Sequence, residues 1–374
     1  MPHLMGDFQI SDRLMRYSDF IPRFYNLCRS YGFEAGKIMP SRAFCSDESQ
    51  GFPIILITKH FGTFPFNHGR VGGIVSTGRH GPHAHHGQDL VIIQASHVGY
   101  DPEKERFGIY RRLQTEDRIQ GPACGKIQGV LSWYRKEYAF ARENIAFSHL
   151  NGDDVVIVDN QLLDPNREAG LFPHLEALID MEPGTRPEPL TIFSTSKAFP
   201  VNRAFKSRLP AEAWKGGIRE PIGGALTADL FHFKRPISNA PEGRDQLELN
   251  LSYTMPQIVT AKHPELTAAQ TNTQLEFDRT YRSIIKEREY HGKNLAFISG
   301  INIDVSPREG QAFPLTKFVP WAAYIQTRGG WSAILEQRKL FIDLSAQSLE
   351  NENQIDLEDA IRRMKERPAL KIAP

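Results

Sequence analysis

Cysteine is scarce in this chain of 374 residues, which has only Cys28, Cys45 and Cys124. Three widely separated cysteines are too few for a disulfide framework. Their number therefore indicates a reducing compartment, in which a cysteine serves as a metal ligand, a catalytic group or a small core residue.

Long apolar runs and an excess of either charge are also lacking. No run reaches the roughly 18 apolar residues of a membrane-spanning helix, and the N-terminal residues MPHLMGDFQISDRL contain no apolar signal-peptide core. The 45 basic and 44 acidic residues almost cancel. We therefore expect neither a membrane nor a nucleic acid as a partner.

Short apolar runs predict an α/β fold. The runs GKIMPSRAFC, FPIILITKHF, DLVIIQASHVGYD and KNLAFISGINIDV are typical of buried strands, and we expect the last of these strands to end at Gly300. Residues 90–93 are apolar throughout, which predicts a central strand covered on both faces.

Other segments have apolar residues at helical spacing. The segments SDFIPRFYNLCRSYGF and GKIQGVLSWYRKEYAF predict helices, and Cys28 lies on the apolar face of the first. The segment QIDLEDAIRRMKERP predicts a short amphipathic helix with Asp356 at its N-cap. We therefore expect one α/β domain over residues 1–345, with a mixed, largely parallel central sheet flanked by helices, and a tail over residues 346–374.

Three candidate metal ligands share one expected setting. Cys45 follows an apolar run, His97 follows DLVIIQA, and Cys124 lies in a turn that opens a helix. In open α/β sheets, sites form at the carboxyl ends of strands. Two thiolates and one imidazole are a common zinc set, and three protein ligands leave a fourth position for water. From residue types alone, small packed residues, a thiol nucleophile and a redox pair remain alternatives.

The motifs AFCSDE, SHVGYD and GPACGK occur in this order, together with TFPF at residues 63–66 and LAFISGINID. This series resembles the limiting-CO2-inducible B/C (LCIB/LCIC-like) family, zinc carbonic anhydrases related to the β-class and also grouped as theta-class. The resemblance implies a β-carbonic-anhydrase-like fold and zinc held by Cys45, His97 and Cys124. It also implies Asp47, two residues after Cys45, as a catalytic residue.

The function implied by this resemblance is the reversible hydration of CO2 to bicarbonate by zinc-bound hydroxide. Asp47 would orient the nucleophile, or ligate the metal in a resting state. The resemblance also implies a homodimer. We expect a cytoplasmic protein, and relatives that work in plastids leave such a compartment open.

The chain departs from the β-class pattern Cys-x-Asp-x-Arg, because Ser49 stands where that pattern has arginine. Arg42, Arg79 and Arg111 are candidates for the arginine partner of Asp47. Asp101 is either the residue that orients His97 or a turn residue.

Other residues near these motifs allow further roles. Four histidines, His80, His83, His85 and His86, form either a solvated loop, a proton shuttle or a second metal site. Phe44, Phe64 and Phe66 are candidates for the lining of a CO2 pocket, with packing in the core as the alternative. Gly99 and Gly125 would let the backbone approach the metal closely.

Two functions of other classes stay open. One is a zinc-binding regulatory protein of the same fold without turnover. The other is a cysteine hydrolase with Cys124 as the nucleophile, His97 as the base and Asp47 as the orienting group.

Overall fold

The computed structural model describes residues 8–76, 89–112, 120–209, 214, 219–236, 244–311 and 314–365. The chain divides into two compact units, the first formed by Met1–Ile127 with Ala268–Pro374 and the second by Gln128–Thr267. The predicted domain limits at residues 345 and 346 stay a prediction. Each unit is described by itself.

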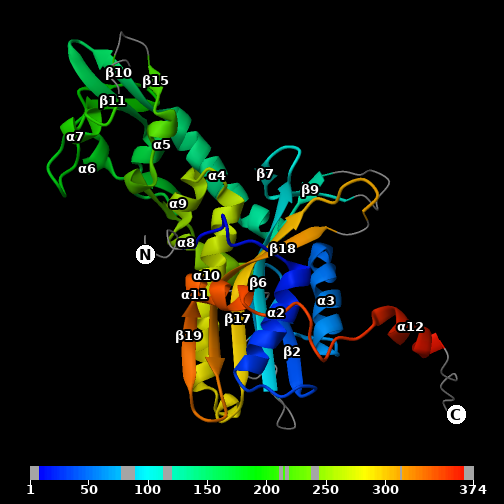
Figure 1. Cartoon of the computed structure of the whole chain (residues 1–374). Coiled ribbons are helices and arrows are strands. Elements are labelled where there is room, and N and C mark those ends of the chain that lie inside the picture. Colours follow the sequence, from blue (N-terminus) through cyan, green and yellow to red (C-terminus); the bar gives the residue numbers. More distant parts are fainter. Residues whose placement is uncertain are drawn as a thin grey trace, which may run out of the picture. The chain divides into compact units, whose positions relative to one another are not determined.

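The first unit is built on an eight-stranded mixed sheet (Figure 1). Its main path runs β1-β18-β17-β6-β2-β3, with β19 paired to β18 and β7 paired to β6. The strands are β1 (Met15–Arg16), β2 (Ile38–Ala43), β3 (Phe66–Asn67), β6 (Asp89–Asp101), β7 (Arg106–Phe107), β17 (Leu295–Val305), β18 (Leu315–Gln326) and β19 (Ser332–Glu336).

The centre of this sheet is parallel. Strand β6 pairs in parallel with β17 on one side and with β2 on the other, and β2 pairs in parallel with β3. Strand β18 is antiparallel to β17 and begins the antiparallel edge. The predicted mixed, largely parallel sheet is therefore confirmed, and β6 is the central strand that its all-apolar run indicated.

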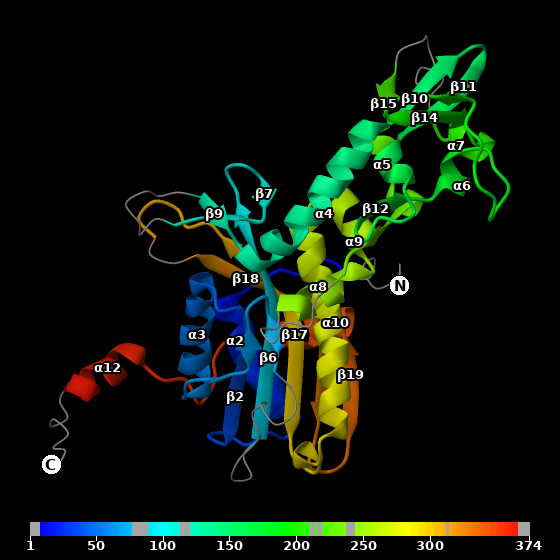
Figure 2. The same cartoon turned by 180° about the vertical axis from the view of Figure 1, so that it is seen from behind.

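Helices cover both faces of the sheet. On one face lie α2 (Tyr17–Ser30), α3 (Gly51–Phe61) and α11 (Gln337–Ser345), whose apolar side chains pack on Val91 and Ile93 (Figure 1). On the other face, α10 (Pro264–Lys286) packs on Leu90 and Ile92 (Figure 2). Alternate residues of β6 therefore point into two separate cores, as the two-residue period of a strand requires.

The prediction of a strand at FPIILITKHF was wrong, because these residues form helix α3. A short apolar run does not reveal its period, and Pro53 suits the first turn of a helix as well as a turn before a strand. The helix ends at Gly62, whose φ of 73° is the left-handed C-cap conformation that glycine favours.

Two predicted helices are confirmed at the chain's start and end. Cys28 lies in α2 and is fully buried, as a core residue. Helix α12 (Leu357–Lys365) begins after Asp356, whose carboxylate accepts hydrogen bonds from the backbone N–H groups of Glu358 and Asp359.

Short strands and one long helix complete the neighbourhood of the candidate site. These are β4 (Gly69–Arg70), β5 (Ile74–Val75), β8 (Ile109–Arg111), β9 (Gln120–Pro122) and α4 (Gly125–Asn144). Helix α4 confirms the helix predicted after the GPAC turn.

The second unit contains a separate five-stranded antiparallel sheet of order β13-β14-β11-β10-β15. Its strands are β10 (Ile145–Leu150), β11 (Asp153–Asp159), β13 (Thr191–Ile192), β14 (Ser196–Pro200) and β15 (Glu220–Pro221), and β12 (Gly170–Pro173) pairs with β16 (Phe231–Lys234). The remaining helices are α5 (Asn160–Leu163), α6 (Leu175–Leu178), α7 (Arg203–Lys206), α8 (Arg244–Ser252) and α9 (Met255–Thr260).

Within the described ranges, none of the helices combines the length and the apolar character that crossing a membrane requires.

Candidate metal centre

Cys45, His97 and Cys124 converge on one point inside the first unit. Their potential ligand atoms all lie within 4.8 Å of one another, and the two sulfur atoms are 3.7 Å apart. The side chains are buried, with exposed fractions of 4% for Cys45, 0% for His97 and 2% for Cys124. This cluster, called the Cys-His-Cys cluster below, can hold a metal ion.

The register of the parallel strands brings Cys45 to His97. Ala43 at the end of β2 lies opposite Gln94 on β6. Cys45 is two residues beyond Ala43, and His97 is three residues beyond Gln94 in the same direction. The two side chains therefore meet beyond the carboxyl end of β2, the edge at which α/β sheets form sites. His97 itself lies within β6, which continues to Asp101 rather than ending before the histidine.

Backbone hydrogen bonds fix the turn that carries Cys124. The N–H of Gly99 donates to the carbonyl of Ala123 at 2.7 Å, and the N–H of Ala123 donates to the carbonyl of Gly108 at 3.1 Å. A Cβ atom at Gly99 would lie 2.5 Å from the carbonyl oxygen of Ile109. Glycine at position 99 therefore lets β8 approach β6 and holds Cys124 at the start of α4.

The glycine-rich segment after β3 closes over Cys45. The N–H of Gly72 donates a hydrogen bond to Cys45 Sγ at 3.2 Å. A Cβ at Gly73 would lie 2.7 Å from the carbonyl oxygen of Ala95 on β6. The backbone that approaches a cluster sulfur is therefore that of Gly72, whereas a Cβ at Gly125 would meet only a Pro122 carbon at 3.9 Å.

Asp304 orients His97, a role that the sequence interpretation did not assign. His97 Nδ1 lies 2.9 Å from Asp304 Oδ2, and both side chains are fully buried. Because the carboxylate only accepts, we place the His97 proton on Nδ1. His97 Nε2, on the far side of the ring, is buried and has no hydrogen-bond partner among the described residues. A carboxylate–histidine pair of this kind prepares a ring nitrogen for a metal.

Three other side chains fix the Asp304 carboxylate. Ser49 Oγ donates to Oδ2 at 2.9 Å, Gln50 Nε2 donates to Oδ2 at 2.8 Å, and Thr316 Oγ1 donates to Oδ1 at 3.2 Å. Ser49, which replaces the arginine of the β-class pattern, therefore contributes to the orientation of His97 through Asp304. The buried carboxylate thus accepts from all three of these side chains as well as from His97.

Asp101 is a turn residue. Its Oδ1 accepts a hydrogen bond from the N–H of Glu103 at 2.9 Å, and its Oδ2 accepts one from Gln120 Nε2. The alternative in which Asp101 orients His97 is therefore wrong.

The surroundings of the cluster favour ionisation of one of its two cysteines, Cys45. The contact with Cys124, together with the nearby His97 ring and the N–H of Gly72, lowers the pKa of Cys45 to about 4 although burial opposes the shift. Burial lowers the pKa of His97, but the sulfur atoms beside it, Cys124 first, and the hydrogen bond to Asp304 outweigh burial and raise this pKa. The cluster therefore attracts positive charge, which either protons or a metal cation supply.

Asp47 follows Cys45 by two residues and caps the short 3-10 helix at Glu48–Gln50. Its Oδ1 accepts a hydrogen bond from the N–H of Ser49 at 3.2 Å, and the side chain is partly exposed. Among the described residues no arginine pairs with Asp47. Arg111 pairs instead with Glu103, and Arg42 makes no ion pair with a described residue.

Tyr110 on β8 also lies near these carboxylates. Burial raises the pKa of Tyr110 to about 12, and the charges of Asp304, Glu48 and Asp47 add to the shift. Its phenol is therefore protonated at neutral pH and is available to donate a hydrogen bond.

The structure describes the three candidate phenylalanines of the pocket lining but not the histidine-rich segment. Phe44 is buried in the core against Tyr17, whereas Phe64 and Phe66 are 77% and 48% exposed. Phe44 is therefore a core residue, and a pocket lining by Phe64 and Phe66 stays a prediction. Arg79 and the four histidines, His80, His83, His85 and His86, lie outside the described residues.

The fold of this chain is similar to that of solved structures. PtLCIB4, a homolog of the limiting CO2-inducible protein LCIB, matches with a TM-score of 0.51 and 12% identity over 87% of this chain and 95% of that chain. This chain has the LCIB-like fold. A histidine-to-alanine mutant of PtLCIB4 matches with a TM-score of 0.51 and 11% identity over 87% and 94% of the two chains. No family model and no curated protein matches the chain.

The LCIB-like fold confirms the resemblance noted in the motifs. It accounts for the central parallel strands of the first unit. At this level of identity the likeness concerns the fold, and the chemistry of the site is argued from this chain's own residues.

Proposed function

We propose that this chain is a zinc enzyme that hydrates CO2 to bicarbonate reversibly. The observation that carries the proposal is the buried convergence of two sulfurs and one imidazole nitrogen within 4.8 Å. In a tetrahedral site with zinc–sulfur distances of about 2.3 Å, two sulfurs lie about 3.8 Å apart. The sulfurs of Cys45 and Cys124 lie 3.7 Å apart, which fits such a site.

Zinc is the metal that this donor set favours. Two thiolates and an imidazole suit a tetrahedral zinc ion, and hard cations such as magnesium prefer oxygen ligands. Zinc with three protein ligands lowers the pKa of a water molecule to about 7, and so supplies a nucleophile at neutral pH.

The chain's own residues would position the reactants. Asp304 keeps the proton of His97 on Nδ1 and leaves Nε2 as the donor atom. Asp47, two residues after Cys45, would accept a hydrogen bond from the attacking water and orient it. Tyr110 on β8 adds a protonated phenol near both carboxylates. CO2 is small and uncharged, so it needs no charged binding group.

The role of Asp47 can be separated from zinc binding. In Asp47→Asn, the side-chain oxygen still accepts from Ser49 N–H, but the negative charge is lost. We expect kcat/KM for CO2 hydration, measured by stopped flow, to fall by about 100-fold or more while zinc content stays near one per chain. Glu48→Gln is the matched control, because Glu48 is exposed and pairs with Arg112. This control should retain the wild-type rate.

An equal loss in both variants would remove Asp47 from the mechanism. A wild-type protein that contains zinc and hydrates no CO2 above the buffer rate would support the second candidate, a zinc-binding protein without turnover. The burial of all three cluster residues favours this second candidate, since structural zinc sites are closed. The homodimer stays a prediction.

A further inference from the structure

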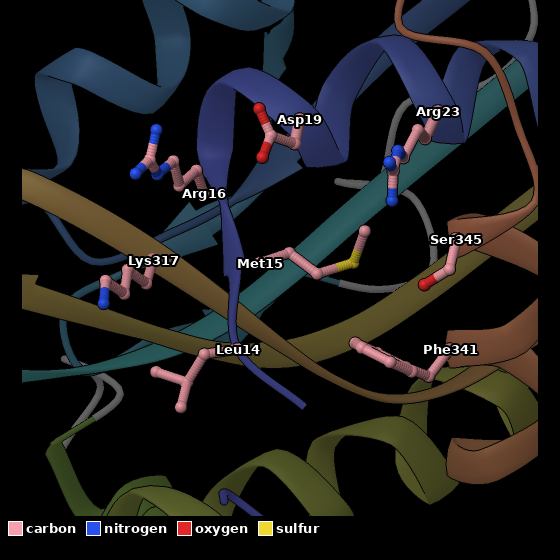
Figure 3. A pocket seen from close by; sticks show the side chains of 8 residues that line it. All are labelled: Leu14, Met15, Arg16, Asp19, Arg23, Lys317, Phe341 and Ser345. Carbon is pink, nitrogen blue, oxygen red and sulfur yellow. The ribbon is translucent and has the colours of Figure 1, made fainter. Parts of the chain in front are cut away.

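A small cavity in the first unit gathers basic side chains away from the Cys-His-Cys cluster. Its volume is about 270 Å³, below the roughly 300–1,000 Å³ of pockets for drug-sized ligands. Figure 3 shows side chains around it from β1, α2, β18 and α11. The lining residues are Leu14, Met15, Arg16, Asp19, Arg23, Lys317, Phe341 and Ser345.

The charges of this cavity are unbalanced. Arg16, Arg23 and Lys317 face a single carboxylate, that of Asp19, so two positive charges remain. None of the three basic side chains forms an ion pair within the part of the chain that the structure describes. The Asp19 carboxylate accepts a hydrogen bond from Ser18 Oγ at 3.1 Å.

The strand register places two of these cations opposite each other. Arg16 on β1 is the direct antiparallel partner of Lys317 on β18. Like charges directly opposite on neighbouring strands destabilise the pairing. A bound anion would remove this repulsion.

The third cation, Arg23, has a donor atom without a hydrogen-bond partner among the described residues. Arg23 Nε is buried and has no partner among the described residues. Figure 3 shows the Arg23 side chain extending from α2 toward the middle of the view, where Met15 lies. Arg16 is also the N-cap residue of α2 and makes no side-chain cap hydrogen bond. The positive end of the α2 dipole therefore adds to the field of the three cations.

We propose that this cavity binds a tetrahedral dianionic oxyanion, as inorganic phosphate or as the phosphate group of a small ester. Two net positive charges complement a dianion. The guanidinium and ammonium groups come from three elements, β1, α2 and β18, and each can donate several hydrogen bonds to the oxygen atoms of a phosphate. Phe341 and Leu14 add apolar side chains to the lining.

This oxyanion cavity is distinct from the candidate metal centre. None of the residues that line the cavity belongs to the Cys-His-Cys cluster or donates a hydrogen bond to Asp304. The proposal therefore stands or fails independently of CO2 hydration.

Binding can be measured by isothermal titration calorimetry of the full chain with inorganic phosphate, at an ionic strength held constant with sodium chloride. We expect saturable binding of one phosphate per chain. Lys317→Gln and Arg23→Gln should each weaken binding by about tenfold or more. Lys262→Gln is the matched control, because Lys262 is exposed and lies outside the cavity.

A thermal readout separates anion binding from a structural role. In phosphate-free buffer, Lys317→Gln should raise the Tm slightly because the repulsion from Arg16 is lost. At the same phosphate concentration, the Tm of the wild type and of Lys317→Arg should rise by more than that of Lys317→Gln. A structural role alone would instead give a lower Tm for Lys317→Gln in both buffers.

Three results would overturn the proposal: no saturable phosphate binding, an unchanged dissociation constant in Lys317→Gln, or binding of acetate as tight as that of phosphate. Titration with glycerol 3-phosphate distinguishes a site for inorganic phosphate from a site for a small phosphate ester. Tighter binding of this ester than of inorganic phosphate assigns the cavity to a phosphorylated metabolite, and equal or weaker binding assigns it to the free ion.

Discussion

Replacing Cys124 with serine is expected to lower the zinc content of the purified protein from about one ion per chain to less than one tenth. A hydroxyl is a far weaker zinc ligand than a thiolate, and only Cys45 and His97 would remain in the cluster. The site is buried, so no exposed group replaces the lost sulfur. The metal content can be measured by inductively coupled plasma mass spectrometry after dialysis. The rate of CO2 hydration should fall to the buffer rate in the same samples.

The control for this experiment is Cys28→Ala. Cys28 is equally buried, but it lies on α2 and packs in the hydrophobic core. It belongs to no cluster of candidate ligands among the described residues. This variant should lose stability, by about 1 kcal/mol for the removed sulfur, and keep its zinc. If Cys124→Ser retains a full complement of zinc, Cys124 is not a ligand and the proposed site is wrong.

Replacing Asp304 with asparagine is expected to weaken zinc binding by about 10–100-fold, the usual effect of losing the carboxylate behind a metal-bound histidine. Asparagine is nearly isosteric, and its amide oxygen in the place of Oδ2 still accepts from Ser49 and Gln50, while its NH2 group faces the Thr316 hydroxyl, which can also accept. The negative charge that holds the His97 proton on Nδ1 is lost. Competition with a chromogenic chelator measures the zinc dissociation constant directly.

Asp101→Asn is the matched control for Asp304→Asn. Both aspartates are fully buried and both lie on strands of the central sheet, but Asp101 accepts from Glu103 N–H and does not contact His97. We expect zinc affinity to be unchanged in Asp101→Asn. The opposite ranking, with Asp101→Asn the weaker binder, would return the orienting role to Asp101 and contradict the geometry of His97.

Much of the sheet was predictable because its central strands are locally unambiguous. The run of residues 90–93 is apolar at every position, as expected of a strand covered on both faces. The segment of α3 is equally apolar but helical. Its identity depends on how Gly62 ends it and on which partners cover it, and neither follows from a short apolar run.

The three candidate ligands could be named from the sequence because cysteine and histidine are rare and each follows or precedes a recognisable element. Asp304 was missed because we expected its strand to end at Gly300, whereas β17 continues to Val305 across an irregularity at Ser299 and Gly300. A signal was present. An aspartate inside the apolar run LAFISGINIDV is expected to be buried, and a buried carboxylate needs partners.

The partners of Asp47 could not be predicted from the sequence. Arg42 and Arg111 were chosen as candidates, but long side chains find partners through tertiary packing. Arg111 contacts Glu103 eight residues away, and Arg112 contacts Glu48 from a distant part of the sequence. Ser49, which stands where the β-class pattern has arginine, contacts Asp304 across 255 residues of sequence.

X-ray absorption at the zinc K-edge of the purified protein tests the candidate metal centre most directly. We predict two sulfur neighbours at about 2.3 Å and one or two nitrogen or oxygen neighbours at about 2.0–2.1 Å. The sulfur contribution should halve in Cys124→Ser reloaded with zinc. A spectrum without sulfur in the first shell, or with four sulfurs, would show that the metal does not lie among Cys45, His97 and Cys124.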